Sequence, residues 1–180
     1  PTTGKFANYT SADKVPLNTD KDFTLKIITK EGKEINAVTK ILPKVMIDSV
    51  VTEFQDTFAR VLTYLTDNQS TSNYYRRTLN FGSLDSIPLQ DFATDDKLAT
   101  TAKFAFGTGY DFVKGDTIFN TIYHMSKEYF EFFRTINIAK ASNGNIIAQP
   151  STIKSNVKGS ANPIGIFTGL SYDQKMTIIK

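Results

Sequence analysis

Acidic side chains form the first group of residues in this chain that could carry chemistry. Asp91, Asp95 and Asp96 lie close together, and Asp111 and Asp116 flank a second segment that contains glycine. Carboxylate oxygens are the ligands that Ca²⁺ prefers. Neither group has the alternating spacing of an EF-hand loop or ends in a suitably placed Glu. Because Asp also favours turns through bonds to its own backbone, solvated turns explain both groups, and no metal ion or other cofactor is expected.

His124 is the second feature, because it is the only histidine and the chain has no cysteine. A hydrolase triad or a zinc site would depend entirely on this side chain. It lies between a predicted strand and a predicted helix cap, so a hydrogen bond at the helix boundary is the ordinary explanation. A glycosidase with two carboxylates stays open, although Trp is absent and a sugar platform would need Tyr110 or Tyr172. We expect a protein that is not an enzyme.

Glycine and arginine patterns argue against two further kinds of site. Gly107-Thr108-Gly109 lacks the third glycine and the following helix that a dinucleotide-binding fingerprint requires. Arg76 and Arg77 are neighbours on a predicted strand, so their side chains point to opposite faces of the sheet. This geometry argues against a joint anion clamp.

The composition is that of a globular domain. The 180 residues are 40% hydrophobic and include 14 Phe and 8 Tyr, so a substantial core can form. The net charge is only +3 and the lysines are spread singly, which argues against nucleic acid as a partner. The absence of cysteine excludes disulfides, and no apolar run reaches the length of a membrane-spanning helix. A start at Pro1 without a signal peptide favours a fragment or a processed piece.

Alternation of apolar and polar residues predicts that most of the chain forms strands. Phe23, Leu25 and Ile27 share one face, a turn follows at Glu31-Gly32, and the return strand ends before Pro43. A second strand pair is predicted at 47–54 and 58–65, joined by a polar corner. Further strands are predicted at 74–81, 103–106 and 117–125.

One helix and one long loop are predicted among these strands. Ser126 is suited to cap a helix over about residues 127–141, in which Tyr129, Phe132, Phe133 and Ile136 form an aromatic stripe. The segment 82–100 contains Pro88 and little periodicity, so we expect a surface loop there. The predicted fold class is therefore mainly β, an antiparallel β-sandwich with one late α-helix packed on the sheet.

Several short segments, in chain order, resemble one family of uncharacterised outer-membrane lipoproteins often encoded beside SusC-type TonB-dependent transporters. The similar features are a strand with a Gly turn and an extended return, and a Pro-containing link to an Ile-Asp-Ser step. They continue with an Asn-Tyr-Tyr-Arg strand, a Gly-Asp strand before an aromatic helix, and a Ser-Asn-Val ending that reaches Gly-Ile-Phe. These features lie at 23–39, 42–49, 73–76, 115–132 and 155–167. Their glycines suit turns and close approach of strands.

The resemblance implies an exported protein on the extracellular face of the outer membrane of a Gram-negative bacterium. Residues 1–43 would then be the C-terminal strands of an immunoglobulin-like β-domain, and 44–180 a β-sandwich domain with a helical insertion. The family's first β-strands, expected before Gly4, and its lipidated cysteine are not among these residues. Membrane attachment through an N-terminal lipid anchor is thus implied by the resemblance and is not carried by this chain.

The resemblance also implies a role as a non-enzymatic accessory module of a TonB-dependent uptake system, which captures ligand or docks on the transporter barrel. Irregular loops on a rigid sandwich usually carry recognition, so we expect the contact surface in the 82–100 loop and the 107–116 turns. The alternatives are a structural or adhesive subunit of a larger envelope complex for secretion or motility, a cell-surface hydrolase, and a viral structural protein. The expected contact residues are Asp91, Asp95, Asp96, Tyr110, Asp111 and Asp116.

Overall fold

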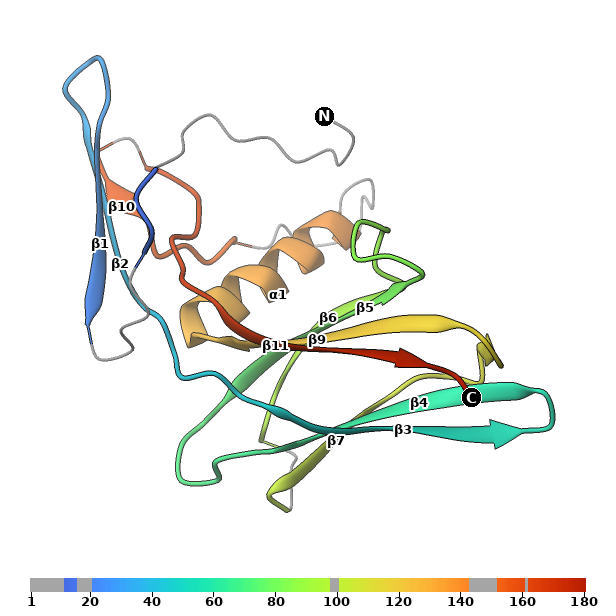
Figure 1. Ribbon diagram of the computed structural model, residues 1–180. Helices are drawn as coiled ribbons and strands as arrows, with labels where there is room; N and C mark the ends of the chain where they lie inside the picture. Colours follow the sequence, from blue (N-terminus) through green and yellow to red (C-terminus); the bar gives the residue numbers. More distant parts are fainter. Residues whose placement is uncertain (1–11, 16–20, 98–100, 143–151, 161) are drawn as a thin grey trace.

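The computed structural model describes residues 12–15, 21–97, 101–142, 152–160 and 162–180, which fold mainly into strands (Figure 1). The strands form three antiparallel sheets, and the described residues contain one helix, which confirms the predicted mainly-β fold with a late helix. The elements are β1 (Asp22–Ile28), β2 (Glu34–Lys40), β3 (Ile47–Gln55), β4 (Phe58–Thr66), β5 (Tyr74–Phe81), β6 (Gln90–Asp95), β7 (Lys103–Gly107), β8 (Phe112–Val113), β9 (Thr117–Met125), α1 (Lys127–Ser142), β10 (Lys158–Gly159) and β11 (Ser171–Ile178).

Two of the sheets pack face to face as a β-sandwich. One has the order β3-β4-β7, with β8 beside β4, and the other has the order β11-β9-β5-β6. Every second residue of β4 is buried, as expected for a strand with one face on a core. The apolar core between the sheets consists of Ala59, Val61, Leu79, Phe112, Ile118 and Ile179 in one cluster and Ile47, Leu65, Tyr75, Phe106 and Ile122 in another.

One side of the sandwich is fastened by Asp173 on β11. Its carboxylate accepts a hydrogen bond of 2.8 Å from the Ile47 N–H and lies 2.7 Å from the Lys44 ammonium. Burial alone would raise the pKa of the Asp173 carboxyl, but these hydrogen bonds outweigh burial and lower it. The edge strand β11 is thereby joined to the start of β3.

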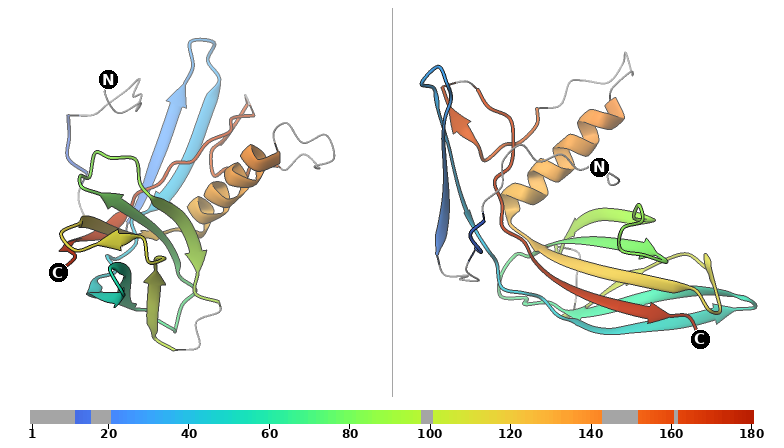
Figure 2. Two further views of the ribbon diagram at one scale, coloured as in Figure 1. Left: turned by 90° about the vertical axis from the view of Figure 1, so that its right-hand side faces the viewer. Right: turned by 45° about the horizontal axis from the view of Figure 1, so that its top comes forward.

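The third sheet is a small arm, formed by β1, β2 and β10, that stands away from the sandwich (Figures 1 and 2). The predicted hairpin is confirmed, and Gly32 supplies the positive φ of 76° at its turn. β10 pairs with β2, where a Cβ on Gly159 would lie 2.2 Å from the Glu34 carbonyl oxygen, so only glycine fits there. Residues 41–46 link the arm to the sandwich. The predicted domain boundary at residue 43 falls within this link, and it stays a prediction.

The helix α1 follows β9 and begins at the predicted cap. Ser126 Oγ accepts a hydrogen bond of 3.2 Å from the Tyr129 N–H, which satisfies one of the free N–H groups of the first turn. α1 lies on the outer face of the β11-β9-β5-β6 sheet, on the side away from the sandwich core (Figure 2). In the described part of the chain, no helix has the length and apolar character needed to cross a membrane.

Arg76 is the main polar contact between α1 and the sheet. Its guanidinium donates to the Tyr129 hydroxyl at 2.9 Å and lies 4.9 Å from the centre of the Phe133 ring. Beside it, the rings of Tyr74 and Phe130 pack with their centroids 4.9 Å apart. The aromatic stripe of the helix therefore covers the outer face of the sheet, as its predicted packing on the sheet requires.

The predicted loop over 82–100 is wrong in its second half, because Gln90–Asp95 forms β6 and pairs with β5. Its residues do alternate, with Phe92 directed towards the Phe106 ring on β7 and Asp91 on the opposite face, beside Arg76. Pairing with a long neighbouring strand compensates for the weak strand propensity of its Asp and Ala residues. Residues 82–89 do form an irregular connection, and 98–100 lie outside the described residues.

Candidate functional site

Three of the predicted contact residues lie on β6 or directly after it, and each has its own partner. Asp91 accepts two hydrogen bonds from Arg76, both of 2.6 Å. Asp95 lies 3.3 Å from the ammonium of the lysine two residues later. Asp96 accepts a hydrogen bond of 2.6 Å from the Asn73 N–H. These contacts fix β6 and the 67–73 loop, and the three carboxylates do not share a common partner.

The other three predicted contact residues lie in the turns between β7 and β9. The Tyr110 ring lies 5.3 Å from the Arg60 guanidinium. Asp116 accepts a hydrogen bond of 2.8 Å from the Val113 N–H and so closes a turn. Asp111 folds back towards the preceding glycine, since a Cβ added at Gly109 would lie 2.8 Å from its carboxylate. This group also consists of turn residues.

The strand register separates these two groups. Asp95 and Met125 both lie opposite Tyr74, at the end of β9, whereas Asp116 precedes Thr117, at its start. At about 3.3 Å per residue, Asp116 lies roughly 25–30 Å along β9 from the level of Asp95, and roughly 15 Å from the level of Asp91, which pairs with Thr78 opposite Thr121. Within the described residues, no three His, Asp or Glu side chains are grouped to hold a metal ion. Their role as a contact surface stays a prediction.

The same register separates His124, on which a hydrolase would depend, from the carboxylate of Asp116. Asp116 and His124 lie at opposite ends of β9, on the order of 25 Å apart. The Nδ1 atom of His124 lies 2.8 Å from the Pro43 carbonyl oxygen. This is a hydrogen bond near the helix boundary, and its partner lies in the link between the arm and the sandwich.

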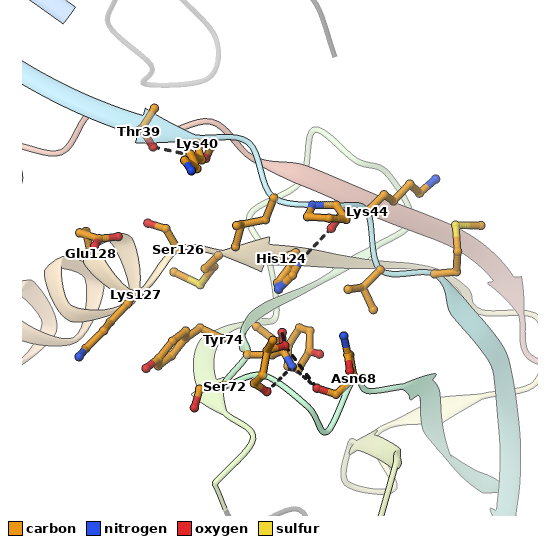
Figure 3. Close-up of a pocket in the computed structure, with 18 of the residues that line it drawn as sticks. Thr39, Lys40, Lys44, Asn68, Ser72, Tyr74, His124, Ser126, Lys127 and Glu128 are labelled. Atoms are coloured by element: carbon orange, nitrogen blue, oxygen red, sulfur yellow. Dashed lines mark hydrogen bonds between the residues drawn. The ribbon is translucent and has the colours of Figure 1, made fainter. Parts of the chain in front are cut away.

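A cavity of about 1120 Å³ opens where the arm meets the sandwich (Figure 3). Its walls come from the end of β2 and the link 41–46, the 66–73 loop, the start of β5, and the junction of β9 with α1. In Figure 3, Thr39 and Lys40 lie on one side, Ser72 and Tyr74 on the other, and Glu128 at the first turn of α1. Segments distant in the sequence thus form one concave surface.

His124 directs a hydrogen-bonding atom into this cavity. Because the Pro43 carbonyl can only accept, Nδ1 must carry a proton and donate to it. In the neutral ring, Nε2 then has a free lone pair, and the ring is directed into the space across from Tyr74 (Figure 3). The edge of His124 that lines the cavity can therefore accept a hydrogen bond from a bound molecule.

Buried polar contacts hold the wall behind His124 in place. Its ring stacks on Tyr75 at a centroid distance of 5.7 Å, and the Tyr75 hydroxyl donates to the Asp67 carboxylate. Asn73 Nδ2 donates to the same carboxylate at 3.1 Å. Burial, followed by the hydrogen bond to Asp67, raises the pKa of Tyr75, so the phenol stays a proton donor. The wall is a satisfied network of the kind that keeps a site preformed.

Apolar side chains line part of the cavity beside polar ones such as Thr39, Ser72 and Ser126, and charged side chains of both signs are also among the lining residues. Lys40 lies 3.5 Å from Asp22, and Lys44 pairs with Asp173, so these cations are partly neutralised. Such a lining suits a small molecule with an apolar body and a few hydrogen-bonding groups. The apolar lining residues are Val38, Leu42, Pro43, Val45, Met46 and Met125.

Little in the sequence indicated this cavity. Its lining comes from both sides of the arm–sandwich link, and no local motif marks where such segments meet. His124 was the one sequence signal near it, as the only histidine in the chain. Tyr74 was recognisable only as half of a tyrosine pair on a strand.

The comparisons with known proteins place the chain in a family. The family model for a domain of unknown function, DUF4249, matches residues 2–176. The chain belongs to this family. No curated protein and no solved structure matches it. The DUF4249 assignment covers the arm, the sandwich and the helix alike, so the cavity lies wholly within the matched region.

Proposed function

We propose that this chain is a non-catalytic ligand-capture module that works with a TonB-dependent transporter at the outer membrane of a Gram-negative bacterium. In this proposal the module is exposed on the cell surface and is held there by a lipid anchor upstream of these residues. The sequence resemblance described above supports the location and the partner. The cavity of about 1120 Å³ carries the proposal of ligand capture.

The lining of the cavity favours binding over catalysis. The His124 ring is held by the Pro43 carbonyl and stacked on Tyr75, so its position is fixed, and the ring forms part of the cavity wall. The carboxylate nearest to that ring system, Asp67, is occupied by the Tyr75 hydroxyl and by Asn73. A ligand with an apolar body and an N–H or O–H group can donate to Nε2 while it packs against Tyr74.

Two exposed methionines allow a matched test of the cavity. Met46 lines it and is 55% exposed, whereas Met176 is 60% exposed on the outer face of β11 and does not line it. We expect Met46→Trp to fill the cavity and Met176→Trp to leave it open. The chain has no tryptophan of its own, so both variants also gain the same spectroscopic label.

The experiment incubates each protein with the small-molecule fraction of the producing culture, removes unbound solutes by gel filtration and measures retained mass by native mass spectrometry. We expect the wild type and Met176→Trp to retain the same adduct and Met46→Trp to retain at least tenfold less. Equal retention by all three proteins would place binding elsewhere, and retention by none would contradict capture in this cavity.

A docking role is the second candidate, because the 82–89 connection exposes apolar side chains. Ile87 is 90% exposed, and Leu84 and Leu89 on the same connection are about half exposed. Exposed apolar groups on a loop favour contact with another protein. Under this candidate the chain is a structural or adhesive subunit of an envelope complex. Identifying the protein that co-purifies with the chain distinguishes this role from partnership with a transporter.

A further inference from the structure

Arg77 on β5 is a buried cation without an acidic partner in the described part of the chain. It is 0% exposed, and its side chain lies between the two sheets of the sandwich. Its guanidinium donates to three neutral oxygens: Gln90 Oε1 at 2.6 Å, the Gly107 carbonyl at 3.1 Å and Asn120 Oδ1 at 2.8 Å. Its Nε atom has no acceptor among the described residues. Burial lowers the pKa of Arg77 to about 10, so the group remains a cation at neutral pH.

Asn120 on β9 contributes a second donor without an acceptor. The residue is fully buried, and its Oδ1 atom accepts from both Arg77 and the Thr63 hydroxyl, while Nδ2 has no partner in the described part of the chain. Exchanging the oxygen and nitrogen positions of the amide would not give Nδ2 an acceptor, because Nδ2 would then face the guanidinium, which can only donate. The orientation of Asn120 is therefore fixed by Arg77.

The two free donors are neighbours. Nε is bonded to the same carbon as the Nη2 atom that contacts Asn120, and Nδ2 is bonded to the same carbon as Oδ1. Since Nη2 and Oδ1 are 2.8 Å apart, the donors flank one hydrogen bond in the interior of the protein. Buried donors without acceptors and buried charges without counter-charges both destabilise a fold.

A small anion would supply both the acceptor that the two donors lack and the negative charge that the guanidinium lacks. A water molecule could accept from the two donors, but it would bring two hydrogens that need acceptors and would leave the charge uncompensated. A halide accepts from both donors and neutralises the guanidinium. The position is close to the side of the sandwich, because Gln90 lies on the edge strand β6 and Gly107 on the edge strand β7.

We propose that Arg77 Nε and Asn120 Nδ2 form an internal binding site for a small monovalent anion of the chloride class. The ion completes a polar connection through the core, since Thr63 and Gly107 belong to one sheet and Arg77 and Asn120 to the other. Binding of the ion to the folded chain stabilises the sandwich. This site is separate from the cavity at the arm and does not depend on the proposed function.

The first test compares unfolding in sodium chloride and in sodium gluconate at equal ionic strength. Above the dissociation constant, one bound ion lowers the unfolding equilibrium constant about tenfold for each tenfold rise in chloride. Gluconate is too large for the position and should give no such slope. A crystal soaked in bromide should show an anomalous peak within hydrogen-bonding distance of both donors. Identical unfolding in both salts, or bromide peaks only elsewhere, would overturn the proposal.

Asn120→Asp provides the matched variant, because it places a carboxylate of the same shape against Arg77. We expect it to unfold independently of chloride and to be at least as stable in gluconate as the wild type. Asn80→Asp is the control, since Asn80 is also buried on β5 but donates to the Leu84 and Ser86 carbonyls on the other face of the sheet. Asn80→Asp should be less stable than the wild type, but its unfolding equilibrium constant should depend on chloride concentration as that of the wild type does. If the stability of Asn120→Asp depended on chloride as that of the wild type does, the anion site could not be at Asn120. If this variant does not fold, the salt comparison and the bromide soak of the wild type decide the proposal.

Discussion

The buried phenol of Tyr75 should make the stability of this protein fall at high pH by an amount that can be calculated. Tyr75 is 1% exposed, and its hydroxyl donates to Asp67. Burial, then the hydrogen bond, then the negative charges of Asp67 and Asp96 raise its pKa in the folded chain. In the unfolded chain the phenol titrates near pH 10.

The sign of the effect follows from this difference. A group whose pKa is raised by folding contributes its full stabilisation below the unfolded pKa and loses it as the pH rises. At pH 11, a phenol with a pKa of about 10 is roughly 90% ionised when unfolded, which favours the unfolded chain by about 1.4 kcal/mol relative to pH 8. Each further pH unit adds about the same amount until the folded phenol also titrates.

Tyr75→Phe isolates the effect of ionising this phenol on stability, because it removes the hydroxyl and leaves the ring. At pH 8 the variant should be less stable by about 1.5–3 kcal/mol, since the Asp67 carboxylate loses a hydrogen bond in a buried position. The stability difference between the two proteins should shrink by about 1.4 kcal/mol between pH 8 and pH 11. The other tyrosines and the lysines titrate in both proteins, so their effects cancel.

The assay is urea unfolding at pH 8, 9, 10 and 11, followed by far-ultraviolet circular dichroism because the chain has no tryptophan. Curves for the two proteins that stay parallel over this range would refute the reasoning. They would mean that the Tyr75 hydroxyl is not held protonated by its surroundings.

Three further predictions concern the arm, the edge of the sandwich and the helix. Gly159→Ala should lower the free energy of unfolding by about 1–3 kcal/mol and speed amide exchange in β2, because its Cβ would lie 2.2 Å from a carbonyl oxygen. Gly165→Ala is the control: its Cβ would lie 3.5 Å from the nearest side chain, so stability and exchange should both stay unchanged. Asp173→Asn should cost about 1 kcal/mol at pH 7 in thermal unfolding. Because the folded pKa of Asp173 is lowered, this difference should begin to shrink as the pH falls below about 4 and should disappear as the pH falls through the lower folded pKa. Arg76→Met should cost about 1–2 kcal/mol and accelerate hydrogen exchange in α1 before the sandwich strands; equal protection of α1 in both proteins would contradict its role in docking the helix.

Local patterns were sufficient to predict most of the elements. Period-two alternation located the strands that became β1 to β5, β7 and β9, and Ser126 marked the start of α1. Gly32 and Gly159 serve a turn and a close strand approach, as the short glycine motifs indicated. These features depend on neighbouring residues, so the sequence contains them directly.

Features that depend on distant contacts were not predictable in the same way. β6 has weak strand propensity, and its pairing with β5 and the contacts between Asp91 and Arg76 stabilise it. The sequence indicated that Arg76 and Arg77 would face opposite sides of their sheet, and they do, with Arg76 below the helix and Arg77 in the core. It did not indicate that Arg77 would be buried, since arginine is rarely found there. The cavity combines the arm link with the β9–α1 junction and has no signal within any one segment.

Co-purification from detergent-solubilised outer membrane tests the proposed role most directly. The tagged full chain is expressed in its own host, captured under mild detergent, and its partners are identified by mass spectrometry. We expect recovery of a TonB-dependent transporter barrel at a fixed ratio to the chain, together with the small molecule that Met46→Trp fails to retain. Recovery of a secretion or motility complex, or of no envelope protein at all, would contradict it.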